Sequence, residues 1–201
     1  MKAIETVYNG YRFRSRLEAR WAVFFNVAGI KYEYEPEGFD LGSKWYLPDF
    51  YLTGFDLYVE IKPSHMSDDL KKKCESLCNL FRNKTGASIL LCYGDPAEAT
   101  YLKFYGWEID EEDLDGGTCD ANALFFADKS GKIKLCIEGH GDTICVRDTM
   151  LRNDYVGDFG FSEAQDQNLP LYWGLESSSN NFLYFCRAKA RQARFEYGEN
   201  G

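Results

Sequence analysis

The sequence predicts an α/β fold in which helices flank a mixed β-sheet. Three observations predict it: apolar residues recur at helical spacing after Ser15, three short alternating segments follow between residues 31 and 62, and a second amphipathic stretch leads into a buried strand. We expect this core in residues 1–100, and an acidic segment with a small β-rich hairpin extension in residues 101–180. A basic C-terminal helix that packs on the core is expected in residues 181–201.

The first helix is predicted to begin after Ser15 and to end at Gly29. Apolar side chains between Leu17 and Ala28 fall on one stripe of a helix with 3.6 residues per turn. Ser15 and Glu18 have the spacing of a capping box, in which the glutamate reaches back to the Ser15 amide. Glu18 lies at the border of the apolar stripe, a position that also suits a side chain reaching toward the sheet.

Three strands are expected to follow this helix as a meander. The first covers residues 31–35 and stops at Pro36, and the other two cover residues 44–52 and 55–62. The turn between the last two is predicted at Thr53-Gly54. The order of elements up to this point is therefore one helix and three strands.

A second helix is predicted over residues 68–84, and the apolar run 87–93 that follows Gly86 predicts a buried strand. Cys74 and Cys78 lie one turn apart on this helix. Such a pair suits a metal site, but buried cysteine also behaves as a small hydrophobic residue, and we favour that interpretation.

The second half of the chain has weaker patterns. Residues 123–127 and 132–138 predict a hairpin, and residues 144–147 predict a further strand. The stretch 148–180 is rich in Asn, Asp, Ser and Gly and predicts loops with short turns. A last helix is expected from about residue 181 to residue 195.

Composition limits the classes of protein that this chain can be. Its 201 residues are 45% hydrophobic, enough for one core and one domain. The formal net charge of −9 excludes a basic coat protein for nucleic acid. The run Trp21–Phe25 is far too short for a transmembrane helix, and the first residues lack a secretory signal. We therefore expect a cytoplasmic protein with no membrane partner.

The seven cysteines are odd in number and irregular in spacing, which argues against a disulfide framework. Most are expected to be reduced thiols. One group has spacings that could suit a structural zinc site. It comprises Cys119, Cys136, His140 and Cys145.

Charge is distributed unevenly along the chain. Residues 104–128 hold eight acidic residues and no lysine or arginine, which indicates a solvated acidic loop or a surface that mimics or repels nucleic acid. Basic side chains cluster near both ends of the chain. The candidate phosphate-binding residues among them are Arg14, Arg16, Arg20, Arg191 and Arg194. Trp45, Tyr11 and Phe13 are candidates for stacking on bases, although such residues more often pack in a core.

Asp49, Glu60 and Lys62 carry the chemistry that the sequence suggests. Alternate side chains on a strand share a face, so Glu60 and Lys62 point the same way. If Thr53-Gly54 is a two-residue turn, Asp49 falls opposite Tyr58 and becomes the diagonal neighbour of Glu60 on that face. Any even-length turn keeps the two carboxylates on one face, where they can share a Mg²⁺ ion.

With this pattern the sequence resembles the PD-(D/E)XK nuclease superfamily, whose fold is restriction-endonuclease-like with an αβββαβ core. The resemblance rests on Pro48-Asp49 and Glu60-Ile61-Lys62, and on the upstream helical Glu18. Residues 11–25, 34–39, 46–50 and 187–196 are similar to uncharacterised members carried by phages and mobile elements.

The resemblance implies hydrolysis of phosphodiester bonds with Mg²⁺ or Mn²⁺. It implies that Asp49, Glu60 and Glu18 bind the metal and that Lys62 orients or deprotonates the attacking water. DNA is the expected substrate, and a phage-infected or bacterial host is the expected setting. The alternative is a binding protein with a nuclease fold whose catalytic activity is dispensable. It would inhibit a host defence complex in the manner of an anti-CRISPR or other anti-defence protein. The intact Asp49, Glu60 and Lys62 favour the enzyme, and the net charge favours the binding protein.

Overall fold

The structure, a computed structural model, describes most of the first half of the chain and several strands and one helix of the second. The described residues are 4–42, 44–64, 67–81, 88–97, 102–109, 116–127, 132–138, 144–147, 155–159 and 181–195. No helix among them is long and apolar enough to cross a membrane.

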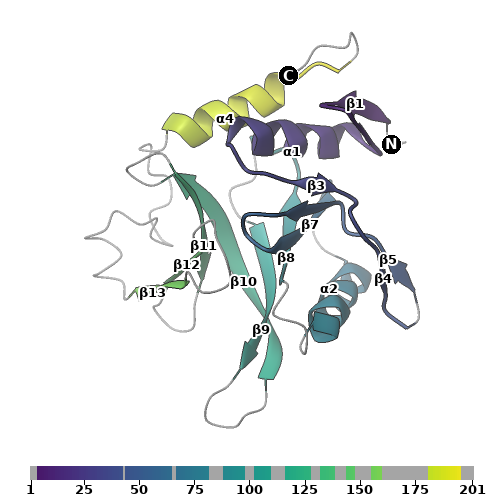
Figure 1. The fold of residues 1–201 in the computed structure, drawn as a ribbon, viewed down its shortest axis with the longest axis vertical. Coiled ribbons are helices and arrows are strands. Elements are labelled where there is room, and N and C mark those ends of the chain that lie inside the picture. Colours follow the sequence, from purple (N-terminus) through teal and green to yellow (C-terminus); the bar gives the residue numbers. More distant parts are fainter. Residues whose placement is uncertain are drawn as a thin grey trace.

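Nine strands form one mixed sheet in the order β13-β12-β11-β10-β9-β8-β7-β6-β3 (Figure 1). β7 and β8 pair in parallel, and the other neighbours in the sheet are antiparallel. The prediction of an α/β fold with a mixed sheet is confirmed. The strands are β3 (Glu33–Tyr34), β6 (Phe50–Leu52), β7 (Leu57–Lys62), β8 (Ser88–Tyr93), β9 (Leu102–Ile109), β10 (Gly116–Ala127), β11 (Ile133–Glu138), β12 (Ile144–Arg147) and β13 (Tyr155–Phe159).

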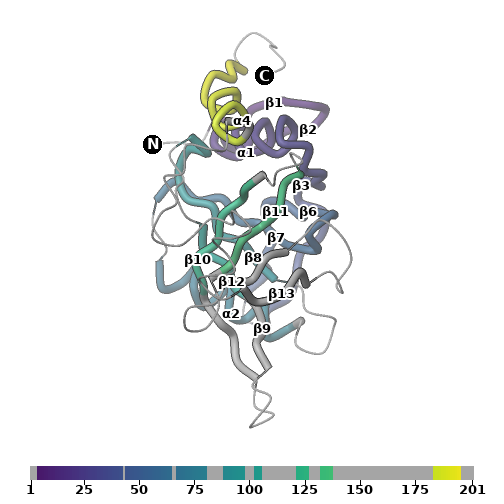
Figure 2. Tube along the Cα trace, turned by 90° about the vertical axis from the view of Figure 1, so that its left-hand side faces the viewer, coloured from purple at the N-terminus to yellow at the C-terminus, as the bar shows by residue number. Residues whose placement is uncertain are grey.

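Helices cover both faces of the sheet. α1 (Arg16–Val27) and α4 (Asn181–Gln192) contribute to the larger apolar cluster together with one face of β6, β7 and β8. α2 (Asp68–Phe81) contributes to a second cluster on the opposite face. Both views show α4 lying beside α1 (Figure 2). The sheet is therefore a central layer between two helical layers.

α1 forms where the sequence predicts it, because its start and its buried stripe are both encoded locally. Ser15 is the N-cap, and its hydroxyl oxygen accepts a hydrogen bond from the Glu18 amide at 3.2 Å. Phe24 and Phe25 are almost fully buried against the sheet. The helix ends before Gly29, whose φ of +72° is the left-handed conformation that favours glycine.

The turn between β6 and β7 is longer than the predicted Thr53-Gly54 turn. Leu52 pairs with Leu57, so the turn contains the four residues 53–56, and the Phe55 amide donates to the Leu52 carbonyl. Asp56 adopts a positive φ of 50° in this turn. Because the turn is still even in length, the faces of the two strands remain as predicted.

The described part of residues 102–159 corrects three expectations. Most of β9 and all of β10 lie in the segment 104–128, where a solvated acidic loop was expected, although residues 110–115 and 128 lie outside the described part. β13 lies within the stretch 148–180, where only loops and turns were expected. The strands from β9 to β13 continue the same sheet as β8, so they are not a small appendage to it.

Two short hairpins were not predicted. The first joins β1 (Thr6–Tyr8) to β2 (Tyr11–Phe13) and precedes α1. The second joins β4 (Phe39–Asp40) to β5 (Trp45–Tyr46), so the strand expected over residues 44–52 is divided into β5 and β6. The second hairpin lies beside the end of β7 that carries Glu60, because Tyr46 contacts that side chain.

Candidate functional site

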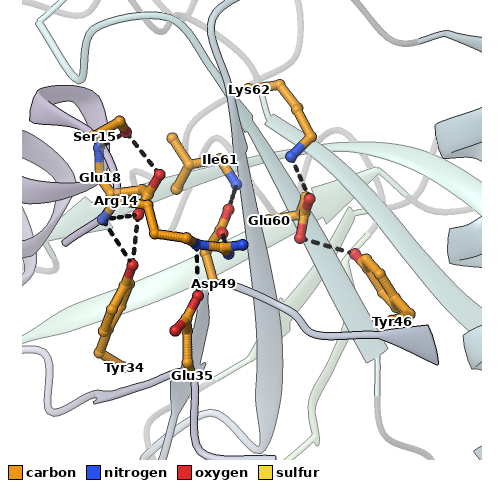
Figure 3. Close-up of polar contacts among 10 residues, drawn as sticks. All are labelled: Arg14, Ser15, Glu18, Tyr34, Glu35, Tyr46, Asp49, Glu60, Ile61 and Lys62. Atoms are coloured by element: carbon orange, nitrogen blue, oxygen red, sulfur yellow. Dashed lines mark hydrogen bonds and ion pairs between the residues drawn. The ribbon is translucent and has the colours of Figure 1, made fainter. Parts of the chain in front are cut away.

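Three of the predicted site residues meet near one end of the interior strand β7. Glu60 and Lys62 belong to β7, two positions apart, and therefore share a face of the sheet. Asp49 directly precedes β6, whose first residue, Phe50, pairs with Val59. Extending this register by one residue would place Asp49 opposite Glu60. The two carboxylates lie near enough for the charge of Glu60 to raise the pKa of Asp49, and each is held by its own partners (Figure 3).

Asp49 is buried, and each of its carboxylate oxygens has a donor. Oδ2 accepts a hydrogen bond from the Ile61 amide at 2.7 Å, and Oδ1 lies 2.8 Å from Nη2 of Arg14. Burial and, after it, the charge of Glu60 raise the pKa of Asp49 to about 7. Lys62 and the Ile61 amide act in the opposite direction. Asp49 therefore changes its charge near neutral pH.

Glu60 is also buried and has a different donor on each oxygen. The hydroxyl of Tyr46 donates to Oε2 at 3.0 Å, and the ammonium of Lys62 forms an ion pair and hydrogen bond with Oε1. Burial lowers the pKa of Lys62, but the charges of Glu60 and Asp49 outweigh that effect and raise it. Lys62 is therefore an ammonium at neutral pH, able to donate hydrogen bonds but not to accept a proton.

Glu18 holds the chain at the start of α1. Its Oε1 accepts a hydrogen bond from the Ser15 hydroxyl at 2.7 Å, and its Oε2 accepts from the Arg14 amide at 3.1 Å and from the Tyr34 hydroxyl at 2.7 Å. The sequence predicts a capping contact with the Ser15 amide, whereas the carboxylate reaches the Arg14 amide. The charge of Glu18 also raises the pKa of Asp49, so Glu18 acts electrostatically on the site.

The three predicted phosphate-binding arginines near α1 lie in different surroundings. Arg14 forms the ion pair with Asp49 and is drawn in the centre of the site (Figure 3). Arg20 forms an ion pair with Asp95 at 2.6 Å, beyond the end of β8. Arg16 is the first residue of α1 and is half-buried. The structure thus brings Arg14, and not Arg20, into contact with the carboxylates.

Arg191 and Arg194 lie near the end of α4 and are exposed. Phe195 packs edge-to-face against Tyr8, with ring centroids 6.1 Å apart, so this end of the helix lies beside β1. The two arginines are therefore accessible groups on the layer formed by α1, α4 and the first hairpin.

The three candidate stacking residues separate by exposure. Phe13 is completely buried, and Tyr11 packs against the same cluster, so both are core residues. Trp45 is 70% exposed on the β4–β5 hairpin, one residue from Tyr46. A Cβ atom at Gly38 would lie only 2.4 Å from the Trp45 indole nitrogen, so glycine at position 38 allows the ring to lie flat on the backbone.

The candidate zinc site falls mostly outside the described residues, so it stays a prediction. Cys136 is buried in the larger apolar cluster. The side chain of Cys119 and the whole of His140 lie outside the described residues, as does the side chain of Cys145. Cys74 and Cys78 belong to α2 and are buried in the second apolar cluster, where burial raises the pKa of the Cys74 thiol.

Asp49 and Glu60 are the residues that could hold a metal ion. Among the described residues, no group of three or more His, Cys, Asp or Glu side chains is arranged as a metal site. Mg²⁺ is nevertheless commonly bound by one or two carboxylates, with waters and substrate phosphates as its other ligands. Two buried neighbouring carboxylates, one with a pKa raised by the other, are a donor set that fits a hard divalent cation.

Sequence reasoning missed three side chains that complete the site. Tyr46 donates to Glu60, Tyr34 donates to Glu18, and Glu35 lies 2.6 Å from Nε of Arg14. All three lie in the segments 34–39 and 46–50. The sequence around them shows no alternation that would have assigned these side chains to a face, because the strands β3 and β5 have only two residues each.

A scan of protein-family models and searches of curated proteins and of solved structures found no match to this chain. The arrangement of Asp49, Glu60 and Lys62 is therefore the observation from which a function can be proposed.

Proposed function

We propose that this protein is a metal-dependent nuclease of the PD-(D/E)XK type, which hydrolyses phosphodiester bonds of DNA with Mg²⁺ or Mn²⁺. The observation that carries the proposal is the pair of buried, electrostatically coupled carboxylates, Asp49 and Glu60, with the Lys62 ammonium beside Glu60. The α/β sheet with helices on both faces is compatible with a restriction-endonuclease-like core.

The electrostatics of the carboxylate pair support this proposal. Burying one carboxylate is costly, and burying two beside each other adds repulsion, which is why the pKa of Asp49 rises. Strongly raised carboxyl pKa values of this kind are common at functional sites. A divalent cation held by both groups would offset the repulsion, so the raised pKa of Asp49 supports a cation site here.

The chain's own residues have separable roles in the proposed reaction. Asp49 and Glu60 would hold the metal, which when bound polarises the scissile phosphate and acidifies a water ligand. Lys62, as an ammonium, would donate a hydrogen bond that orients the attacking water. Tyr46 fixes one oxygen of Glu60 and so leaves the carboxylate in one orientation. Glu18 has donors on both oxygens, and we assign it to positioning the chain before α1.

DNA as substrate is part of the proposal. The net charge of −9 repels nucleic acid at long range, so affinity must come from local cations such as Arg14. The 70% exposed Trp45, on the hairpin that contacts Glu60 through Tyr46, offers a ring on which an unpaired base can stack.

A cleavage assay tests the proposed function. Plasmid, single-stranded DNA, branched DNA and RNA are incubated with the protein and Mg²⁺, Mn²⁺ or EDTA. We expect metal-dependent cleavage that is lost in Asp49→Ala and Glu60→Ala and falls steeply in Lys62→Ala. Glu33→Ala, which removes an exposed carboxylate from β3, is the matched control and should cleave normally.

Full activity in Asp49→Ala, or activity that EDTA leaves unchanged, would reject this mechanism. Failure to cleave any of the four substrates would favour the alternative function, in which the fold binds a host defence protein.

A further inference from the structure

We infer that Arg14 is an internal counter-ion that a metal must displace from Asp49, and that the displaced guanidinium then binds a phosphate of the nucleic acid. The inference rests on the proposed function and deepens it by assigning a switching residue to the same site. It is carried by the contacts that Arg14 makes with its backbone and with its side chain.

The backbone of Arg14 is fixed while its side chain remains accessible. The Arg14 amide donates to Oε2 of Glu18 at 3.1 Å and to the Tyr34 hydroxyl oxygen at 3.0 Å. The side chain is nevertheless 56% exposed. A guanidinium on an anchored Cα can change partners without movement of the strand or of α1.

The guanidinium bridges two carboxylates that differ in burial. Nη2 lies 2.8 Å from Oδ1 of Asp49, whose side chain is 4% exposed, and Nε lies 2.6 Å from Oε1 of Glu35, whose side chain is 24% exposed. Arg14 therefore neutralises the buried carboxylate from the solvent side. Glu35 gives the guanidinium a second partner that it keeps if the contact with Asp49 is broken.

A metal ion and Arg14 compete for Asp49. Its Oδ2 accepts the hydrogen bond from the backbone amide of Ile61, whereas Oδ1 contacts the Arg14 side chain, which is 56% exposed and can move away. A divalent cation bound to Asp49 would also lie within a few ångströms of the guanidinium charge, and like charges at that separation repel. Binding of the metal and the Arg14–Asp49 contact are therefore mutually unfavourable.

Phosphate is the natural next partner for the displaced group. A guanidinium presents a planar fork of N–H donors that matches two phosphate oxygens, and a phosphate at the metal would lie next to Asp49. Arg14 would thus stabilise the empty site and, after metal binding, hold the substrate. Lysine at this position would keep the charge but lose the fork.

The test compares Mg²⁺ binding by the wild type, Arg14→Gln and Arg12→Gln, measured by calorimetry. Arg12→Gln is the matched control. It also removes one guanidinium, but from a position two residues before Arg14, where the side chain pairs with Glu5. The titration is run at about pH 8.5, above the pKa of about 7 that Asp49 has beside Arg14, so that proton competition is reduced.

We expect Arg14→Gln to bind Mg²⁺ about tenfold more tightly than the wild type, the size expected for removing one hydrogen-bonded competitor of partly exposed charge. Arg12→Gln should stay within about twofold of the wild type. Thermal unfolding gives a second reading: Mg²⁺ should raise the melting temperature of Arg14→Gln more than that of the wild type. Equal Mg²⁺ affinity in wild type and Arg14→Gln would overturn the inference.

The phosphate contact is tested separately, with a short DNA duplex and a single strand and with Ca²⁺ replacing Mg²⁺ to suppress cleavage. Arg14→Gln should bind DNA more weakly than Arg12→Gln does. The slope of its DNA affinity against salt concentration should fall by the amount expected for about one lost phosphate contact. DNA affinity equal to that of Arg12→Gln would refute the second role of Arg14. If the wild type binds no Mg²⁺ at all, the proposed function fails and the inference fails with it. If the wild type and Arg14→Gln bind Mg²⁺ equally well, only the inference fails.

Discussion

Raising the pH from about 6 to about 8 is expected to strengthen Mg²⁺ binding about tenfold, because Asp49 must lose a proton before it can act as a ligand. Its pKa is raised to about 7 by burial and by Glu60. The ionised fraction of such a group rises from about 0.1 to about 0.9 over this pH range. A carboxyl at the ordinary value of 3.8 would be fully ionised throughout, and the affinity would then be constant.

The assay has two independent parts. Carbon-13 NMR of the metal-free protein follows the Asp49 carboxyl directly, with Asp49→Asn used to identify its signal. Calorimetry at about pH 7, in buffers of different ionisation enthalpy, should show release of about half a proton for each Mg²⁺ bound. A carboxyl midpoint below about pH 5, or equal Mg²⁺ affinities at pH 6 and 8, would refute this reasoning.

The same group makes a prediction for stability without metal. A carboxyl whose pKa is higher in the folded state than in the unfolded state stabilises the fold at low pH, and that contribution is lost as the pH rises through the folded value. For Asp49 this loss takes place as the pH rises from 3.8 to about 7. Urea unfolding at pH 5 and 8 should therefore show a larger decrease for the wild type than for Asp49→Asn, which cannot ionise. Equal decreases would contradict the raised pKa.

Three further substitutions test separate parts of the site. Tyr46→Phe removes the buried donor to Glu60 and should lower the free energy of unfolding by about 1–3 kcal/mol in urea titrations; an unchanged midpoint would mean that the contact adds nothing. Glu18→Gln sets an N–H donor where a buried carboxylate oxygen accepts, so it should lower the free energy of unfolding by about 1–3 kcal/mol while Mg²⁺ affinity stays near wild type, whereas a large loss of affinity would identify Glu18 as a ligand. Trp45→Ala should weaken binding to single-stranded DNA roughly fivefold or more in fluorescence anisotropy. Its matched control, Tyr184→Ala, removes a 77% exposed aromatic ring from α4 and should bind as wild type.

The elements that the sequence predicts well are those whose signals are local. α1 has a capping residue, Ser15, and an apolar stripe, so both its start and its buried face are encoded within one segment. β8 and α2 were found from continuous and periodic apolar patterns. The faces of β6 and β7 followed from parity alone, which explains why an error in the length of their turn left the residues of both strands on the predicted faces.

The missed elements had weak or overlooked signals. Asn9 and Gly10 connect β1 and β2 with positive φ values of 47° and 82°, and Asn-Gly is the strongest short-range signal for a hairpin. The flanking strands of three residues each were too short to show alternation. The strand β9 was missed because an acidic composition was taken to indicate a loop, although strand pairing with β8 and β10 decides its conformation.

The contacts around the carboxylates could not be predicted from sequence in the same way. Arg14 and Asp49 are 35 residues apart in the chain, and Tyr34 meets Glu18 across 16. Such pairs form only when α1 packs against the sheet, so they depend on the tertiary arrangement and not on any local pattern. The sequence indicated which residue types belong to the site, and packing decided which of them touch.

The short β6–β7 hairpin also has a consequence for the order in which the site assembles during folding. Asp49 and Glu60 belong to one hairpin with a four-residue turn, and hairpins of this kind close within about 1–10 microseconds. Arg14 can reach Asp49 only after a much larger loop has closed, a step delayed by its entropic cost. The two carboxylates would therefore meet before their counter-ion arrives, so a divalent cation should accelerate the early stage of refolding.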